Sequence, residues 1–183
     1  MRHMSMRHPF EFIPAGNRRT LFFVFLALTL AGFGIFQLLD EPLRTKAAPA
    51  GVVSFELAGT TKKAGDILKS WNNAPAQLNA AFGLGFDFLF MPVYGVALGL
   101  GVLLAKERRA GWWPGLGAIL GWGALLATIF DALENLALFT ILRGGATSPY
   151  PELAAGCATI KFGLILAGML YGLVGWLVGR KNG

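Results

Sequence analysis

Histidine and cysteine are nearly absent from this sequence, and each absence excludes a class of chemistry. Cys157 is the only cysteine among 183 residues, so the chain forms no internal disulfide and no cysteine-pair redox relay. The only two histidines, His3 and His8, stand close to the N-terminus. A haem held between helices by two histidines and a histidine-rich zinc site inside a membrane are therefore excluded. We expect neither a metal nor another cofactor.

Charged residues are also scarce. They make up 14% of the chain, against 55% hydrophobic residues, and the mean hydropathy is +0.56. Because a soluble domain of ordinary composition has about 25% charged residues, the shortfall predicts a surface covered by lipid. The formal net charge of +6 does not indicate nucleic-acid binding, since the basic residues collect at the ends of apolar segments, where they contact anionic lipid. We expect membrane lipid as a partner and no nucleic acid.

Four apolar segments are long enough to cross a bilayer. They cover about residues 20–39, 82–105, 114–142 and 153–178. A helix needs about 20 residues to cross about 30 Å of hydrocarbon. The sequence therefore predicts an all-α fold, a single membrane domain of residues 1–183 built as a four-helix transmembrane bundle, with a loop at residues 40–81. Glycines four residues apart favour close helix packing: Gly95 and Gly99, Gly117 and Gly121, Gly168 and Gly172, Gly175 and Gly179.

The first apolar segment has an alternative interpretation as a cleaved signal peptide. Arg18 and Arg19 precede it, and Ala48-Pro49-Ala50 is similar to a cleavage site. Signal peptides, however, usually have an apolar core of about 7–15 residues, and this segment is nearer to twenty. We therefore expect a retained membrane helix.

Basic residues at the ends of the spans predict the orientation. Nine lie on the side that carries both termini, and six lie on the other side, five of them spread through the long loop. The positive-inside tendency then places both termini in the cytoplasm and the loop outside it. We expect a multi-pass protein of the bacterial cytoplasmic membrane. The nine are Arg2, Arg7, Arg18, Arg19, Lys106, Arg108, Arg109, Arg180 and Lys181, and the six are Arg44, Lys46, Lys62, Lys63, Lys69 and Arg143.

Two segments of the loop have a regular pattern. Residues 52–57 alternate between apolar and polar, which predicts a short extended segment. Residues 61–71 predict an amphipathic helix with Thr60 or Thr61 as its N-cap. This helix either lies on the lipid headgroups with a tryptophan anchor, which we slightly favour, or covers the bundle as a lid. Its apolar face consists of Ala64, Ile67, Leu68 and Trp71, of which the last three are the lid candidates.

Strongly polar residues interrupt three of the four spans. An ionisable group at membrane depth costs about 2.5–3.5 kcal/mol even on insertion scales, so such groups face the interior of a bundle and find partners there. At about 1.5 Å per residue, Glu134 and Lys161 both lie about 12 Å from the outer ends of their spans, which predicts an ion pair. Tyr94, two turns after Asp87, extends the cluster. The polar residues of the spans are Asp87, Asp131, Glu134, Asn135 and Lys161.

These residues predict a ligand-binding pocket in the outer half of the bilayer. Three carboxyl groups face one ammonium group, so Asp87 and Asp131 are in surplus and require a proton or a bound cation. The structural alternative is an ion pair that only fixes which helices pack together. Five polar groups on three helices favour the pocket. Its candidate residues are Asp87, Tyr94, Asp131, Glu134, Asn135 and Lys161.

Several of these positions belong to a longer pattern. Phe55-Glu56-Leu57-Ala58 and Trp71 are followed by Asp87-Phe88-Leu89-Phe90, Tyr94 and Asp131-Ala132-Leu133-Glu134-Asn135. The pattern resembles that of a group of uncharacterised bacterial four-span integral membrane proteins and covers most of residues 50–140. The resemblance implies that the loop and the acidic positions form one unit, and it implies no activity.

Three functions remain open at this point. The first, which we favour, is the binding or transport of a lipid-like or cationic small molecule at the acidic residues. The second is an intramembrane enzyme that uses one carboxyl group as an acid and another as a base on a lipid or lipidated substrate. No phosphate-binding glycine loop, Ser-His pair or metal-ligand set supports it. The third is a structural subunit whose buried charges pair with another chain, either a second copy or a different membrane protein.

Overall fold

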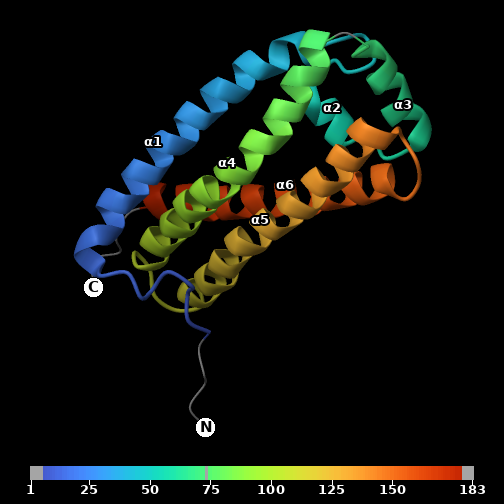
Figure 1. Cartoon of the computed structure of the whole chain (residues 1–183). Helices are drawn as coiled ribbons and strands as arrows, with labels where there is room; N and C mark the ends of the chain where they lie inside the picture. The colour runs from blue at the N-terminus through green and yellow to red at the C-terminus, as the bar shows by residue number, and fades with distance from the viewer. Residues whose placement is uncertain (1–5, 73, 179–183) are drawn as a thin grey trace. The chain divides into compact units, whose positions relative to one another are not determined.

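The computed structural model describes residues 6–72 and 74–178, and within these ranges it is helical without strands (Figure 1). Four helices are long and apolar enough to cross a membrane: α1, α4, α5 and α6. The chain is therefore an all-α, multi-pass membrane protein, as predicted. The elements are α1 (Ala15–Asp40), the 3₁₀-helix η1 (Glu41–Leu43), α2 (Val52–Glu56), α3 (Thr61–Ser70), α4 (Ala74–Lys106), α5 (Trp113–Gly144) and α6 (Tyr150–Leu177).

The chain divides into two compact units, and each long helix contributes a segment to both. The first, the tail unit, contains the described residues up to Thr29, together with Pro92–Thr128 and the described residues from Phe162 onward. The second, the loop unit, contains Leu30–Met91 and Ile129–Lys161. Because the division cuts through the spans rather than between them, a single membrane domain stays a prediction.

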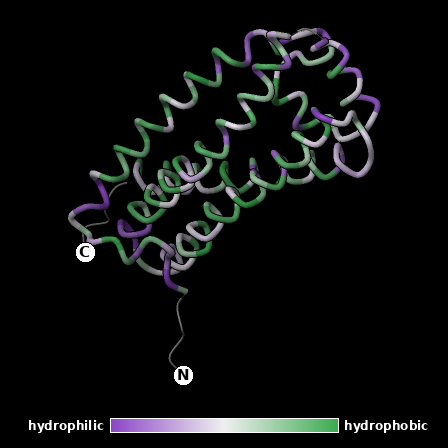
Figure 2. Tube along the Cα trace, viewed as in Figure 1, coloured by the Kyte–Doolittle hydropathy of each residue, from purple (hydrophilic) through white to green (hydrophobic). Residues whose placement is uncertain are grey.

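The loop-unit part of α5 has an apolar outer face and buries its charged side chains. In the loop-unit part of α5, Ile129, Leu133 and Leu136 lie at least 45% exposed, whereas Asp131 and Glu134 are buried. A soluble helix has the reverse arrangement, because its exposed face is charged. Figure 2 shows the same property along the chain, with hydrophobic long helices and hydrophilic connections. Lipid is therefore the environment that suits the exposed surface.

Helix α4 begins eight residues earlier than the predicted second span, which shortens the predicted loop of residues 40–81. Its first turns are rich in alanine, which favours a helix. They also contain Gln77 and Asn79, whose polar side chains lower the local hydropathy, so a search for apolar residues places the start of the span too late. Pro75 suits the start of a helix because the first turn needs no backbone N–H donor. The Asn79 side chain donates a hydrogen bond to the Leu39 carbonyl at 3.2 Å and so links α4 to the end of α1.

The extended segment predicted at residues 52–57 is wrong, because Val52–Glu56 forms the short helix α2. The alternating pattern suggested that Phe55 and Glu56 would face opposite sides. In the helix they are only about 100° apart, so both are buried on one side. Gly51 precedes the helix with a positive φ of 55°, which lets the chain turn sharply into it.

The amphipathic helix predicted over residues 61–71 is present as α3. The Thr60 side chain caps it by accepting a hydrogen bond from the Lys63 backbone. The slightly favoured position on lipid headgroups is wrong, because Ile67 and Trp71 are fully buried in a core that also includes Leu138 of α5. Leu68 packs at the edge of this core. The Trp71 indole donates a hydrogen bond to the Leu43 carbonyl at 2.7 Å.

The predicted glycine contacts occur in the tail unit, although not at every position. A Cβ atom at Gly175 would lie 2.6 Å from the Ala105 side chain, and one at Gly117 would collide with the Tyr171 hydroxyl. Helices at these positions approach too closely for any side chain. A Cβ atom at Gly172 would have no neighbour within 4 Å, so the four-residue spacing of Gly168 and Gly172 does not bring a second helix close to Gly172. Gly179 lies outside the described residues.

The N-terminal segment before α1 packs into the tail unit. His8 is 2% exposed, and its Nδ1 accepts a hydrogen bond from the Phe10 backbone at 3.2 Å. Glu11 pairs with Lys106, and Arg18 pairs with Glu107. Burial lowers the pKa of His8 from 6.5 to about 4, and the positive charge of Lys106 adds to this effect. The imidazole is therefore held neutral.

Candidate functional site

A buried charge cluster in the loop unit is centred on Lys161, near the middle of α6. Its Nζ lies 2.9 Å from Asp131 Oδ1 and 2.8 Å from Glu134 Oε2, both on α5. Asp131 and Glu134 are three residues apart, and this spacing puts both carboxyl groups on one face of the helix. The predicted ion pair of Glu134 and Lys161 is therefore present. Asp131, which was expected to be in surplus, is a second direct partner of the same ammonium group.

Asn135 connects Asp87 to this centre. Its side-chain nitrogen donates to Asp87 Oδ2 at 2.9 Å and to the Leu84 carbonyl at 3.3 Å, both on α4. Asn135 itself is 1% exposed. Asn135 follows Glu134 directly on α5. Glu134 contacts Lys161 of α6 and Asn135 contacts Asp87 of α4, so these two neighbours connect Lys161 to Asp87.

Glu56 of α2 also belongs to the cluster, and sequence reasoning missed it. Its Oε2 lies 3.8 Å from Lys161 Nζ, and the side chain is buried. Glu56 was taken as the polar face of an extended segment, which hid its approach to a membrane helix. Its position inside the Phe55–Ala58 pattern was the only indication in the sequence. We use the name Lys161 cluster for Glu56, Asp87, Asp131, Glu134, Asn135 and Lys161.

The position of α2, and with it Glu56, is fixed by the end of α1. Asp40 Oδ1 accepts a hydrogen bond from the Val52 backbone at 2.7 Å, and its other oxygen pairs with Arg44 at 3.0 Å. A side chain at Gly51 would collide with the Asp40 carboxyl group. The Phe55 ring of α2 also contacts the Trp71 ring edge-on at 5.1 Å. A polar anchor and an aromatic contact thus hold Glu56 toward α6.

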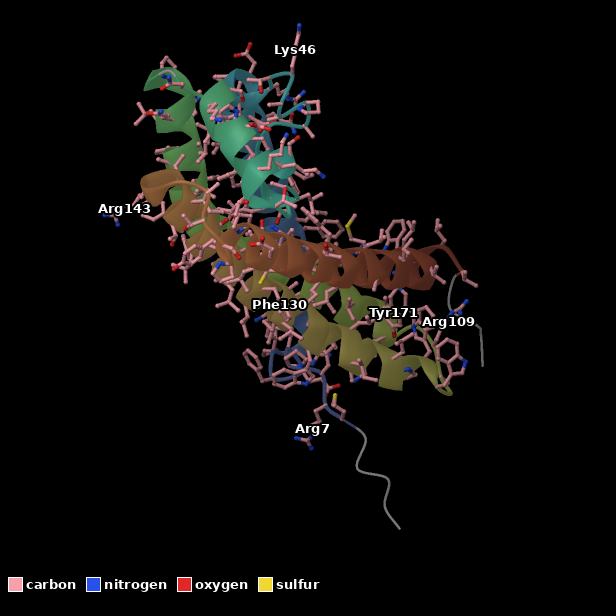
Figure 3. All side chains as sticks on the ribbon, turned by 90° about the vertical axis from the view of Figure 1, so that its right-hand side faces the viewer. Arg7, Lys46, Arg109, Phe130, Arg143 and Tyr171 are labelled. Atoms are coloured by element: carbon pink, nitrogen blue, oxygen red, sulfur yellow. The ribbon has the colours of Figure 1, made fainter. Side chains whose placement is uncertain are left out.

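Three buried carboxyl groups therefore lie next to one ammonium group, and a fourth, that of the half-buried Asp87, is linked to them through Asn135. Burial raises the pKa of Glu56, and the Lys161 ammonium opposes this shift only in part. Two other basic side chains of the loop unit, Lys46 and Arg143, are exposed and point away from the ribbon in Figure 3. An excess of acid without water to solvate it favours either protonation or a bound cation.

Unsatisfied oxygen atoms accompany this excess. Within the described part of the chain, Glu56 Oε2, both carboxyl oxygen atoms of Glu134 and Asn135 Oδ1 are buried without a hydrogen bond, although Glu56 Oε2 and Glu134 Oε2 lie 3.8 and 2.8 Å from Lys161 Nζ as ion-pair partners. An unsatisfied buried acceptor costs about 1–3 kcal/mol. No group of three or more histidine, cysteine or acidic side chains in the described ranges is arranged to hold a metal ion. The arrangement therefore suits a ligand that donates hydrogen bonds.

The remaining predicted site residues lie elsewhere. Tyr94 is buried within the tail unit, whereas all members of the Lys161 cluster belong to the loop unit. The lid candidates Ile67, Leu68 and Trp71 lie in the hydrophobic core of the loop unit. An open groove of about 480 Å³ lies along α2 and α3, and no cluster residue lines it. Leu57 and Ala58, which follow Glu56, are among its lining residues.

The chain was compared with known protein families, curated proteins and solved structures. No family model matches the chain, and the searches of curated proteins and of solved structures found no match. The similarity to uncharacterised bacterial four-span membrane proteins stays a prediction. We therefore infer the function from the multi-pass architecture and from the geometry of the Lys161 cluster.

Proposed function

We propose that this membrane protein binds an amphiphile with a cationic head at the Lys161 cluster. The observation that carries the proposal is the surplus of carboxyl groups: three buried ones lie within 3.8 Å of a single ammonium group, and that of Asp87 is linked to them through Asn135. A cationic head offsets the excess negative charge, and the apolar remainder of the ligand stays in the surrounding lipid. Burial favours such a pair because electrostatic attraction grows as water is removed.

Entry of the ligand involves α2. Glu56 is the only member of the cluster that a short connecting helix carries, whereas the others stand on long spans. A shift of α2, which breaks the hydrogen bond between the Val52 backbone and Asp40, would separate Glu56 from Lys161 while the contacts between α5 and α6 remain. In the orientation that the basic residues favour, with both termini in the cytoplasm of a bacterium, α2 and α3 face outward. The ligand then arrives from the outer leaflet.

Thermal unfolding in dodecylmaltoside micelles tests this function. We expect dodecylamine to raise the unfolding temperature of the wild-type protein, because the amine is protonated at pH 7.5. Dodecanol and laurate have chains of the same length but a neutral or a negative head, and we expect neither to stabilise the protein. Equal effects of all three compounds would show that only the alkyl chain matters.

Two glutamate variants locate the effect. Glu56→Gln removes one surplus carboxyl group from the cluster and should reduce the stabilisation by dodecylamine. Glu152→Gln removes the same charge from an exposed position at the start of α6 and should leave it unchanged. Native mass spectrometry of gently purified protein adds an independent observation: a retained amphiphile supports the proposal, and a retained second chain supports the structural-subunit alternative.

A further inference from the structure

The hydrogen-bond donors and acceptors of the Lys161 cluster are out of balance. The cluster's N–H donors are on Lys161 and Asn135. Asn135 uses its nitrogen on Asp87 and on the Leu84 carbonyl, and the Lys161 ammonium faces Asp131 and Glu134 at less than 3 Å. These donors therefore have acceptors.

The unsatisfied atoms are all acceptors. Glu134 Oε1 and Asn135 Oδ1 have no hydrogen-bond donor among the residues that the structure describes, and Glu56 Oε2 faces the Lys161 ammonium at 3.8 Å, which is too far for a hydrogen bond. They come from two different elements, α2 and α5, and each of the three residues is at most 8% exposed. A buried acceptor is satisfied only by a group that brings its own hydrogen atom. A ligand that neutralises charge without donating hydrogen bonds would leave these oxygen atoms unsatisfied.

This requirement distinguishes between kinds of cation. A protonated primary amine is compact and brings three N–H donors, as a lysine side chain does. A quaternary ammonium group has the same charge and no donor, and proteins usually bind it against aromatic rings. None of the six side chains of the cluster is aromatic. A bare metal ion fits poorly as well, because the described residues offer no suitable set of ligands.

We propose that the Lys161 cluster selects a protonated primary amine over a quaternary ammonium group of equal charge and chain length. The inference rests on the proposed function and specifies the chemical class of the head group. In the bound state the ammonium group of the ligand donates to Glu56 and Glu134, and Asn135 Oδ1 accepts a third hydrogen bond. The ligand thus supplies the donors that the cluster lacks.

Two probes that differ only at the head group test the selectivity. Dodecylamine and dodecyltrimethylammonium are titrated into the full-length protein in dodecylmaltoside micelles at pH 7.5, with binding followed by calorimetry. The same titration of Glu152→Gln shows how much of each signal comes from partition into the micelle. We expect dodecylamine to bind at least tenfold more tightly. Glu56→Gln, which introduces an N–H donor of its own, should reduce this preference severalfold while the protein stays folded by size-exclusion chromatography.

The outcomes separate the inference from the function on which it rests. If both probes bind equally and Glu56→Gln weakens both, charge alone decides; the amine selectivity is then wrong and the cationic site stands. If neither probe binds, the proposed function and the inference both fail. If Glu56→Gln does not fold, Glu56→Asp serves as the second variant, since it keeps a carboxyl acceptor on α2 without adding a donor and should retain the preference for the amine. Loss of the preference in that variant would contradict the donor argument.

Discussion

Replacement of Lys161 by methionine tests whether one ammonium group holds the cluster together. Methionine keeps the length of the apolar stem and removes the charge. The carboxyl groups of Asp131 and Glu134, which lie within 3 Å of Lys161 Nζ, then lose their nearest cation. Loss of one partner of a buried ion pair typically costs about 3–5 kcal/mol, and we expect a loss of this size at pH 8.

The loss should become smaller as the pH falls. Carboxylates without a partner can take up protons, and each pH unit makes protonation of one group easier by about 1.4 kcal/mol. Unfolding by dodecyl sulfate in mixed micelles, measured at pH 8 and at pH 5.5, provides both free energies. Lys62→Met is the matched control, because Lys62 pairs with Asp66 on the exposed face of α3. Exposed pairs contribute about 0–1 kcal/mol.

Two results would refute this reasoning. A loss below about 1 kcal/mol at both pH values would mean that the ammonium group contributes no more than an exposed pair does. A loss that does not depend on pH would mean that the carboxyl groups are already protonated. The double variant Glu134→Gln/Lys161→Met gives a further check, since residues in direct contact should show a coupling energy above about 1 kcal/mol in a double-mutant cycle.

Three other predictions concern parts of the chain outside the Lys161 cluster. Gly175→Ala should destabilise the protein by about 1–3 kcal/mol because its Cβ has no space, whereas Gly172→Ala should be neutral or slightly stabilising, as measured by thermal unfolding. His8 has a folded-state pKa of about 4, below its usual 6.5, so its contribution to stability is complete above pH 6.5 and is lost as the pH falls toward 4. The wild-type protein should therefore lose more stability than His8→Phe between pH 7 and pH 4.5, and equal losses would show that the imidazole is accessible to protons. In a Cys157→Ala background, Lys69→Cys should react with an impermeant thiol reagent in intact cells and Ala110→Cys should not; the reverse pattern would invert the predicted orientation.

The spans could be predicted because their length and composition leave few alternatives. The segments that became α5 and α6 have almost no charge outside the cluster, and no other environment than lipid suits them. Equal depth was enough to predict the pair of Glu134 and Lys161, since a helix rises by a constant amount per residue. The helical spacing of apolar residues was enough to predict the amphipathic helix α3. The spacing could not show that the apolar face of α3 packs against protein rather than against lipid headgroups.

The rest depended on contacts between distant residues. Glu56 joins the cluster because Asp40 holds the start of α2, and no local pattern in the sequence indicates that link. The alternation at residues 52–57 was too short to separate a strand from a turn of helix. The role of Asp131 was missed because depth alone cannot tell which of two carboxyl groups on one helix face meets an ammonium group on another helix.

Photoaffinity labelling tests the central claim, that the Lys161 cluster binds a cationic head group, most directly. An alkyl primary amine with a diazirine on the carbon next to the head group is added to the purified protein, activated by light, and located by peptide mass spectrometry. The proposal predicts labels on α2 near Glu56 and on α5 between Asp131 and Asn135, reduced by excess dodecylamine and by Glu56→Gln. Labels confined to the exposed apolar faces of the long helices, unchanged by competitor, would contradict it.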